Sequence, residues 1–216
     1  MEPDTAYTVT DLASAALAPG VPAALMSSRG RDILPGVLGR LDGRITDFFG
    51  FEVHLGRPEA EVDALVCVKA ATGGREVLAA AIADAGPETW WRDLRSFVAA
   101  WSDPHKPWAS RIANIWLEFD VVAPMQPQPP PSMFFGAVRL IGADEPTALP
   151  GLLEASGLLR GGALGARARA IANQVLATLP VGAAIFQIGQ MIARSGAPLR
   201  LCVRDIGLGD VGPYLS

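Results

Sequence analysis

The chain has few of the residues that most often bind transition metals or form covalent cross-links. It contains two cysteines and two histidines among 216 residues. Cys67 and Cys202 lie far apart within apolar runs, and neither has a second cysteine at the spacing of a zinc site. The sequence therefore excludes a paired-cysteine zinc site and predicts two free, buried thiols.

Signature motifs of common enzyme classes are also missing. There is no phosphate-binding loop, no dinucleotide-binding glycine fingerprint after a strand, and no Gly-x-Ser-x-Gly elbow. The glycine-rich stretch 161–165 precedes a helical segment with Arg167 and Arg169, where an anion could bind, but a flexible link is the simpler interpretation. No motif in the sequence therefore identifies a class of reaction.

An excess of positive charge is absent, since the formal net charge is −4. The general attraction that drives most nucleic-acid binding is therefore missing, and we expect no nucleic-acid partner. The N-terminus lacks the basic start and apolar core of a signal peptide, so the expected location is the cytoplasm.

One uncharged stretch, 170–193, is long enough to be considered as a membrane span. Pro180 and Gly182 interrupt it, and its four amide side chains would be costly in lipid. We expect a helix followed by a strand here, and no membrane span.

Apolar residues are abundant, making up half of the chain, while charged residues make up 19%. This composition supports a large core, and we predict one domain over residues 1–216, with residues 1–10 disordered. Alternating or apolar segments predict three β-hairpins, at 49–55 with 64–69, 111–122 with 133–141, and 185–194 with 199–206.

Five prolines lie between the two strands of the second hairpin and cannot donate to a strand ladder. They predict a stiff proline-rich loop over 123–131, with a docking site for a proline-reading module as the less favoured alternative. Helical segments are predicted at 11–17, 28–41, 75–85, 88–102, 146–159 and 163–179.

The predicted fold class is α+β, with an antiparallel sheet of about six strands. Helices alternate with hairpins as three serial helix-helix-strand-strand units, and we expect the helices to pack on one face of the sheet. This plan resembles, in architecture alone, the antiparallel barrel of soluble aromatic prenyltransferases, whose lumen binds a prenyl diphosphate and an aromatic acceptor. The chain has three such units where that barrel uses five, and it carries no motif of the family residue by residue.

The strand 114–120 is predicted to carry the site. Alternation directs Ile115, Leu117 and Phe119 to the core, and directs Trp116, Glu118 and Asp120 to the other face. Further residues expected on that second face are Glu52, His54, Arg139, Arg200, Cys202 and Arg204.

Glu118 and Asp120 would lie about 7 Å apart along the strand, where two carboxylates could divide acid and base roles or hold a divalent cation. His54 is the candidate general base, because its ordinary pKa lies near neutrality. The alternative is a solvated acidic face on which Arg139 pairs across strands with one carboxylate. Whether any metal or other cofactor is required is left open by the residues.

The leading functional hypothesis is a small-molecule-binding domain, a biosynthetic enzyme that uses this sheet face or a barrel lumen. Glu118, Asp120 and His54 would be catalytic, Trp116 would stack on the ligand, and arginines would neutralise an anionic substrate. Those arginines are Arg139, Arg200 and Arg204. The alternative is a non-catalytic assembly protein that forms a homo-oligomer through its open sheet.

Overall fold

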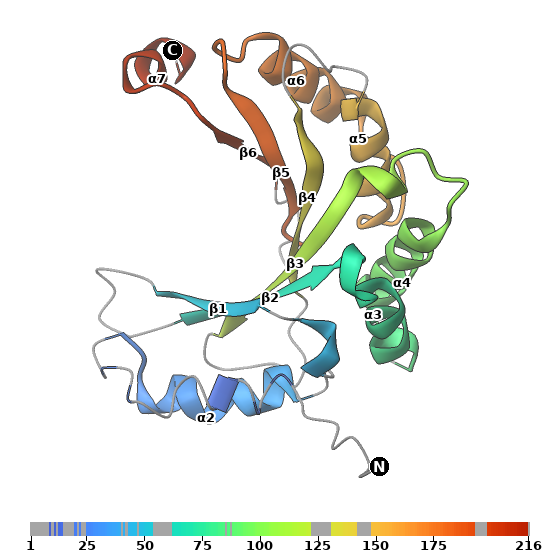
Figure 1. Ribbon diagram of the computed structural model, residues 1–216, viewed down its shortest axis with the longest axis vertical. Helices are drawn as coiled ribbons and strands as arrows, with labels where there is room; N and C mark the ends of the chain where they lie inside the picture. Colours follow the sequence, from blue (N-terminus) through green and yellow to red (C-terminus); the bar gives the residue numbers. More distant parts are fainter. Residues whose placement is uncertain are drawn as a thin grey trace.

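A computed structural model gives the arrangement of the chain in space (Figure 1). It describes residues 9, 11, 13–14, 20, 22, 25–39, 41, 43–46, 48–53, 62–84, 86, 88–121, 131–141, 148–192 and 198–215. Within these ranges the side chains of residues 29, 37, 121, 138, 139, 140 and 215 are not described. The predicted disorder of 1–10 and the predicted loop at 123–131 fall almost wholly outside the described residues.

The predicted α+β fold with a six-stranded antiparallel sheet is confirmed. The strands pair in sequence order, so every neighbour in the sheet is also a neighbour along the chain. They are β1 (Phe48–Val53), β2 (Val62–Lys69), β3 (Ile112–Val121), β4 (Ser132–Ile141), β5 (Ala184–Gln190) and β6 (Leu199–Arg204).

Helices occupy the intervals between hairpins, as expected. The α-helices are α2 (Ser28–Leu38), α3 (Gly74–Ala83), α4 (Thr89–Ser102), α5 (Leu149–Leu158), α6 (Ala166–Ala177) and α7 (Leu208–Leu215). Short 3-10 turns are η1 (Gly43–Ile45), η2 (Ala70–Thr72) and η3 (Ala109–Arg111). In the described part of the chain, no helix is both long and apolar enough to cross a membrane.

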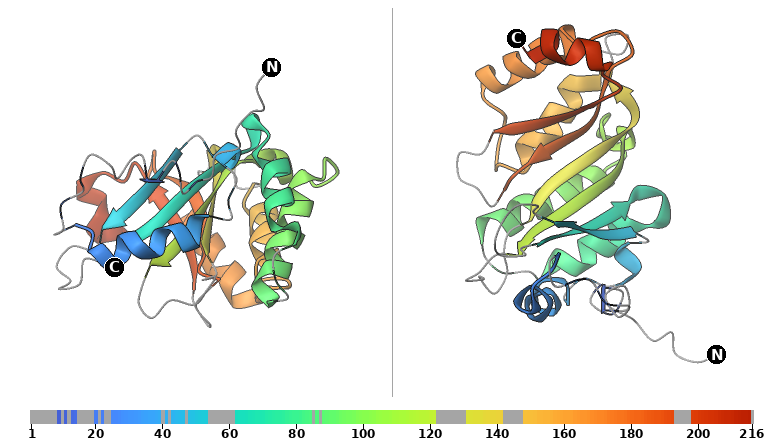
Figure 2. Two further views of the ribbon diagram at one scale, coloured as in Figure 1. Left: turned by 90° about the horizontal axis from the view of Figure 1, so that it is seen from below. Right: turned by 90° about the vertical axis from the view of Figure 1, so that its left-hand side faces the viewer.

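The sheet is curved, with helices α3 to α6 and α2 on its outer side and an open inner side (Figures 1 and 2). We call this inner side the concave face; it carries Trp116, Glu118, Phe134 and Arg200. Ile115, Leu117 and Phe119 are at most 5% exposed and belong to the core on the helix side, as their alternation predicts.

The core centres on α4, whose Phe97 lies 5.9 Å from the ring of Trp108 and 5.8 Å from that of Phe135 on β4. Trp101 is fully buried, and its indole N–H donates to the carbonyl of Ile112 at 3.2 Å. The spacing of apolar residues in 88–102 predicts Trp90 on the buried stripe of this helix, but Trp91 takes the buried position instead. Trp90 is half-buried and stacks on Trp91, with ring centroids 3.9 Å apart.

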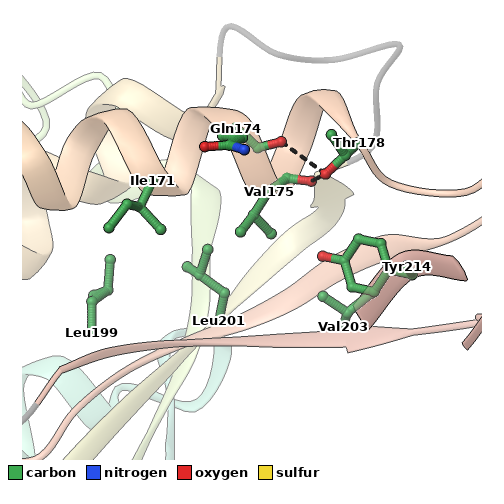
Figure 3. A pocket seen from close by; sticks show the side chains of 8 residues that line it. All are labelled: Ile171, Gln174, Val175, Thr178, Leu199, Leu201, Val203 and Tyr214. Carbon is green, nitrogen blue, oxygen red and sulfur yellow. Dashed lines mark hydrogen bonds between the residues drawn. The ribbon is translucent and has the colours of Figure 1, made fainter. Parts of the chain in front are cut away.

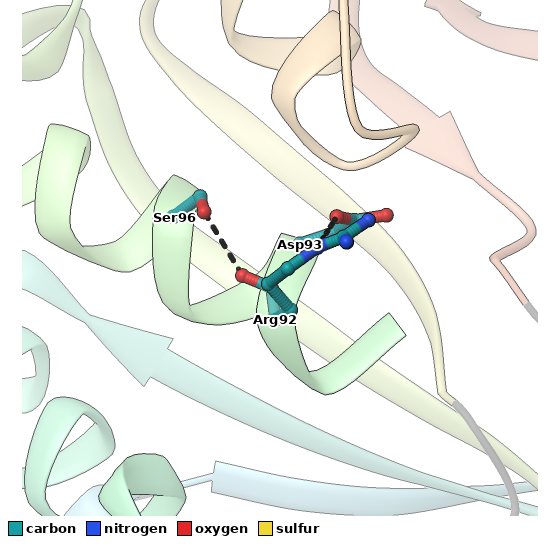
Figure 4. Close-up of polar contacts among 3 residues, drawn as sticks. All are labelled: Arg92, Asp93 and Ser96. Carbon is teal, nitrogen blue, oxygen red and sulfur yellow. Dashed lines mark hydrogen bonds and ion pairs between the residues drawn. The ribbon is translucent and has the colours of Figure 1, made fainter. Parts of the chain in front are cut away.

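A buried charge marks the contact between α4 and the turn after α5 (Figure 4). The carboxylate of Asp93 accepts a hydrogen bond from Arg92 Nε at 3.2 Å, and Ser96 Oγ donates to the carbonyl of Arg92 at 3.0 Å. Gly161 has a φ of +70°, and a Cβ there would lie 3.3 Å from Asp93 Oδ2. Glycine therefore lets this turn both adopt its backbone conformation and approach the carboxylate.

A polar pair links the helix layer to the sheet. Gln190, at the end of β5, donates through Nε2 to Ser156 Oγ of α5 at 2.6 Å, and both side chains are buried. This bond satisfies a serine that would otherwise be buried without a partner in an apolar layer.

Candidate functional site

The register of the strands builds the site from residues that are distant in sequence. Cys67, Trp116, Phe134, Gly189 and Arg200 are successive partners across β2 to β6 and therefore form one row on the concave face. The adjacent row lies two residues further along β3 and consists of Leu65, Glu118 and Ser132. Because directly opposed side chains lie on the same face, the two rows bring an aromatic strip beside a carboxylate.

A cavity of about 360 Å³ opens on the concave face. Three of the predicted site residues line it, namely Trp116, Glu118 and Arg200. The remaining lining residues are Glu52, Leu65, Phe134, Gln187 and Cys202. Its size lies within the range of sites for small organic ligands.

Glu118 is the central charged group of this cavity. It is 6% exposed, and no described side chain donates a hydrogen bond to it. Burial raises its pKa from 4.5 to about 7, and the negative charges of Glu52, Asp63 and Asp120 add to the rise, while Arg200 opposes it. Near neutral pH, Glu118 can therefore either donate or accept a proton.

The other acidic groups surround Glu118. One carboxylate oxygen each from Glu52, Asp63 and Glu118 lies within 4.8 Å of the others, an oxygen set of the kind that binds Mg²⁺ or Ca²⁺. The sequence predicts that Glu118 and Asp120 would hold a cation together. In the structure, the three carboxylates that lie within 4.8 Å of one another include Asp63 and not Asp120. Acidic clusters are common without an ion, and this one does not by itself define a metal site.

Aromatic rings form the apolar part of the site. Phe48 meets Trp116 edge to face, with ring centroids 5.4 Å apart, and the guanidinium of Arg200 lies 6.0 Å from the ring of Phe134. The Phe134 ring also covers Gly189, where a Cβ would lie 2.4 Å from ring carbons. Glycine at this position is what allows the ring to lie flat against β5.

Cys202 lines the same cavity as a thiol. Burial raises its pKa, the charge of Glu118 adds to the rise, and Arg200 opposes it. The thiol is therefore held in its protonated form at neutral pH, which does not favour a nucleophilic role.

Of the other predicted site residues, Arg204 is described in full, Arg139 only by its backbone, and His54 not at all. His54 lies outside the described residues, and so does the side chain of Arg139. The backbone of Arg139 is seven positions along β4 from Ser132, the partner of Glu118, or roughly 20 Å at the rise of a strand. Arg204 is at the end of β6, pairs with Asp205 at 2.7 Å, and is absent from the cavity lining.

Several residues of the site were not among the sequence candidates. Asp63, Ser132, Phe134 and Gln187 reach it only through the pairing of strands. The alternation of side chains along β2 and β4 could have identified Asp63 and Phe134, because each points to the face opposite to that of the buried apolar residues on either side of it. Ser132 is 1% exposed, and its hydroxyl has no hydrogen-bond partner among the residues that the structure describes.

Comparisons of the chain with protein-family models, with curated proteins and with solved structures found no match.

Proposed function

We propose that the protein is an enzyme of small-molecule metabolism that binds an organic ligand on the concave face and exchanges a proton with it through Glu118. The observation that carries this proposal is the carboxyl group of Glu118, which is buried in an aromatic-lined cavity and has a pKa of about 7. A general acid or base is most effective when its pKa lies near the working pH, and perturbed carboxyl groups in clefts gather at functional sites.

The ligand class follows from the lining. Trp116 and Phe134 offer ring faces for a flat, apolar group, and Glu118 offers an acceptor for an N–H or O–H donor. Among the described lining residues Arg200 is the one cation, against the two carboxylates of Glu52 and Glu118. We therefore propose a neutral aromatic molecule with one ionisable N–H or O–H group.

An anionic substrate receives less support from this lining. A diphosphate needs several cationic or backbone N–H donors, and Arg200 is the one cation among the described lining residues. The proposal accordingly extends to proton transfer with an aromatic ligand and does not extend to prenyl transfer.

A binding experiment with 4-nitrophenol tests the proposal, because this phenol absorbs visible light only when ionised. Wild-type protein should bind the neutral phenol, with an affinity that changes as pH passes through about 7, where Glu118 ionises. Glu118→Gln removes the titrating group, so the variant should lose this pH dependence after correction for the ionisation of free phenol.

The matched control is Glu154→Gln, the same substitution at a 55% exposed side chain on α5 that pairs with Lys106. It should bind like the wild type at every pH. Absence of binding, or an unchanged pH profile in Glu118→Gln, would contradict the role of Glu118.

A further inference from the structure

The two edges of the curved sheet are open in the part of the chain that the structure describes. β1 pairs only with β2, and β6 pairs only with β5. Glu52 from β1 and Arg200 from β6 nevertheless line the same cavity, so the sheet curls far enough to turn its ends toward each other. Open edges present backbone groups that can pair with another strand.

An apolar groove runs beside the β6 edge (Figure 3). It has a volume of about 660 Å³ and lies between α6 and β6, with Tyr214 of α7 at one end. Ile171 is 50% exposed there, an unusual state for a large aliphatic residue on a helix that packs against a sheet. The other lining residues are Gln174, Val175, Thr178, Leu199, Leu201 and Val203.

The opposite edge has the complementary features. At β1 the helix layer ends with α2, which lies on the outer side of the sheet (Figure 1). Phe48 on β1 is 53% exposed although its ring contacts Trp116. A helix is therefore available at the β1 edge, whereas at the β6 edge α7 reaches one end of the groove through Tyr214 and leaves the rest of it open.

The directions of the edge strands permit them to pair between two copies. Six strands that alternate in direction leave β1 antiparallel to β6. If a second copy is related to the first by a rotation about the axis around which the sheet curves, its β1 lies beside β6 of the first copy. These two strands then run antiparallel, like every other neighbouring pair in the sheet. The helices of the second copy then fall on the same side, and its α2 lies over the groove beside α6.

Charge selects this pairing over the symmetric ones. Glu52 is exposed on β1 and Arg200 is exposed on β6, and neither has an ion pair among the described residues. In a β6–β6 junction both edges carry Arg200, and in a β1–β1 junction both edges carry Glu52. Like charges on neighbouring strands destabilise a sheet, so unlike edges match.

We propose that two copies of this chain join β1 to β6 at both ends and close their twelve strands into one continuous sheet. Each contact is between different surfaces, and such contacts form a finite assembly when the rotation closes. The concave faces turn toward each other and enclose the two cavities. The dimer depends on edges and charges, not on proton transfer by Glu118, so the two proposals can fail separately.

Light scattering coupled to gel filtration, at tens of micromolar protein, tests the assembly. The wild type should have twice the mass of the 22.6 kDa chain. Ile171→Glu places a charge in the groove where α2 of the second copy packs and should give a monomer with an unchanged far-UV circular dichroism spectrum. The matched control is Val181→Glu, at a fully exposed apolar residue outside the groove lining, which should stay dimeric.

A charge exchange identifies the edges that pair. Glu52→Arg and Arg200→Glu should each weaken the dimer at least tenfold, because each variant opposes like charges at both junctions. The double variant restores unlike charges between β1 and β6 and should recover the dimer. It would not do so for β1–β1 or β6–β6 contacts.

A monomeric wild type, or an open series of larger oligomers, would overturn the closed dimer. A dimer that both single variants weaken and the double variant fails to restore would overturn the β1–β6 pairing. Because these variants are read by mass, loss of 4-nitrophenol binding alone bears on the concave site and not on the assembly.

Discussion

Glu118 is a carboxyl group whose folded environment opposes its charge. Its pKa rises from 4.5 to about 7, chiefly through burial and then through repulsion from three nearby acids. Between these two pH values the folded chain keeps a proton that the unfolded chain releases. The free energy of unfolding should therefore fall as pH rises from about 4.5 to about 7, and the loss is complete above that window.

Replacing Glu118 by Gln should remove this loss. We expect the variant to be more stable than the wild type at pH 8 by about 1 to 3 kcal/mol, with a smaller difference at pH 5. Urea unfolding at the two pH values, in EDTA so that no ion occupies the acidic cluster, measures the effect. Glu154→Gln serves as the control, and an equal Glu118→Gln effect at both pH values would show that Glu118 does not titrate in this window.

Among the strands, β4 and β5 set the shape of the site through a single glycine. The Phe134 ring occupies the space that a Cβ at Gly189 would need. Gly189→Ala should displace the ring, destabilise the fold by about 1 to 3 kcal/mol and weaken 4-nitrophenol binding. Gly162→Ala is the control, because no atom lies within 4 Å of a Cβ there.

Urea midpoints and binding titrations of the two glycine variants measure the difference. Equal midpoints would mean that the ring moves aside without cost. Unchanged binding in Gly189→Ala would remove Phe134 from the ligand contacts.

The elements themselves were largely predictable, because alternation and helical spacing are local properties of the sequence. Ile115, Leu117 and Phe119 could be assigned to the core from parity alone, and that assignment is confirmed. The choice between Trp90 and Trp91 was not local, since it depends on where the stripe of α4 meets β4 and α5. Residues 90 and 91 lie about 100° apart around a helix, while the rest of the stripe keeps its predicted positions.

The site was predictable only in part, for a related reason. Parity placed Trp116 and Glu118 on the concave face, but the partners of Glu118 come from neighbouring strands. Asp63 and Ser132 enter through the register of two different pairs, which loop residues and tertiary packing determine. The roles of His54 and Arg139 stay predictions.

At the scale of the whole molecule, one buried apolar cluster extends through the described chain from the α2 end to β5. It includes Leu34 from α2, Phe97 from α4, Leu152 from α5 and Ile188 from β5. A shared core couples its elements, so we expect one cooperative unfolding transition and not separate melting of the α2 end.

Circular dichroism and tryptophan fluorescence test this, because the five tryptophans all lie between positions 90 and 116 while circular dichroism reports the entire chain. The two urea curves should coincide, and Leu34→Ala in α2 should shift both equally. An earlier circular-dichroism transition would indicate two domains in place of the single domain predicted. In the proposed dimer, both midpoints should also rise with protein concentration.

The hydrogen bond between Gln190 and Ser156 has a consequence for how the chain avoids misfolding. If β5 slipped by one residue against β4, Gln190 would turn to the opposite face and leave the Ser156 hydroxyl buried and unsatisfied. Apolar neighbours such as Ile185 and Ile188 would tolerate this register shift more readily, since one apolar contact can replace another. A buried amide thus favours the correct alignment of the strands, and it does so on the helix side of the sheet, away from the concave face.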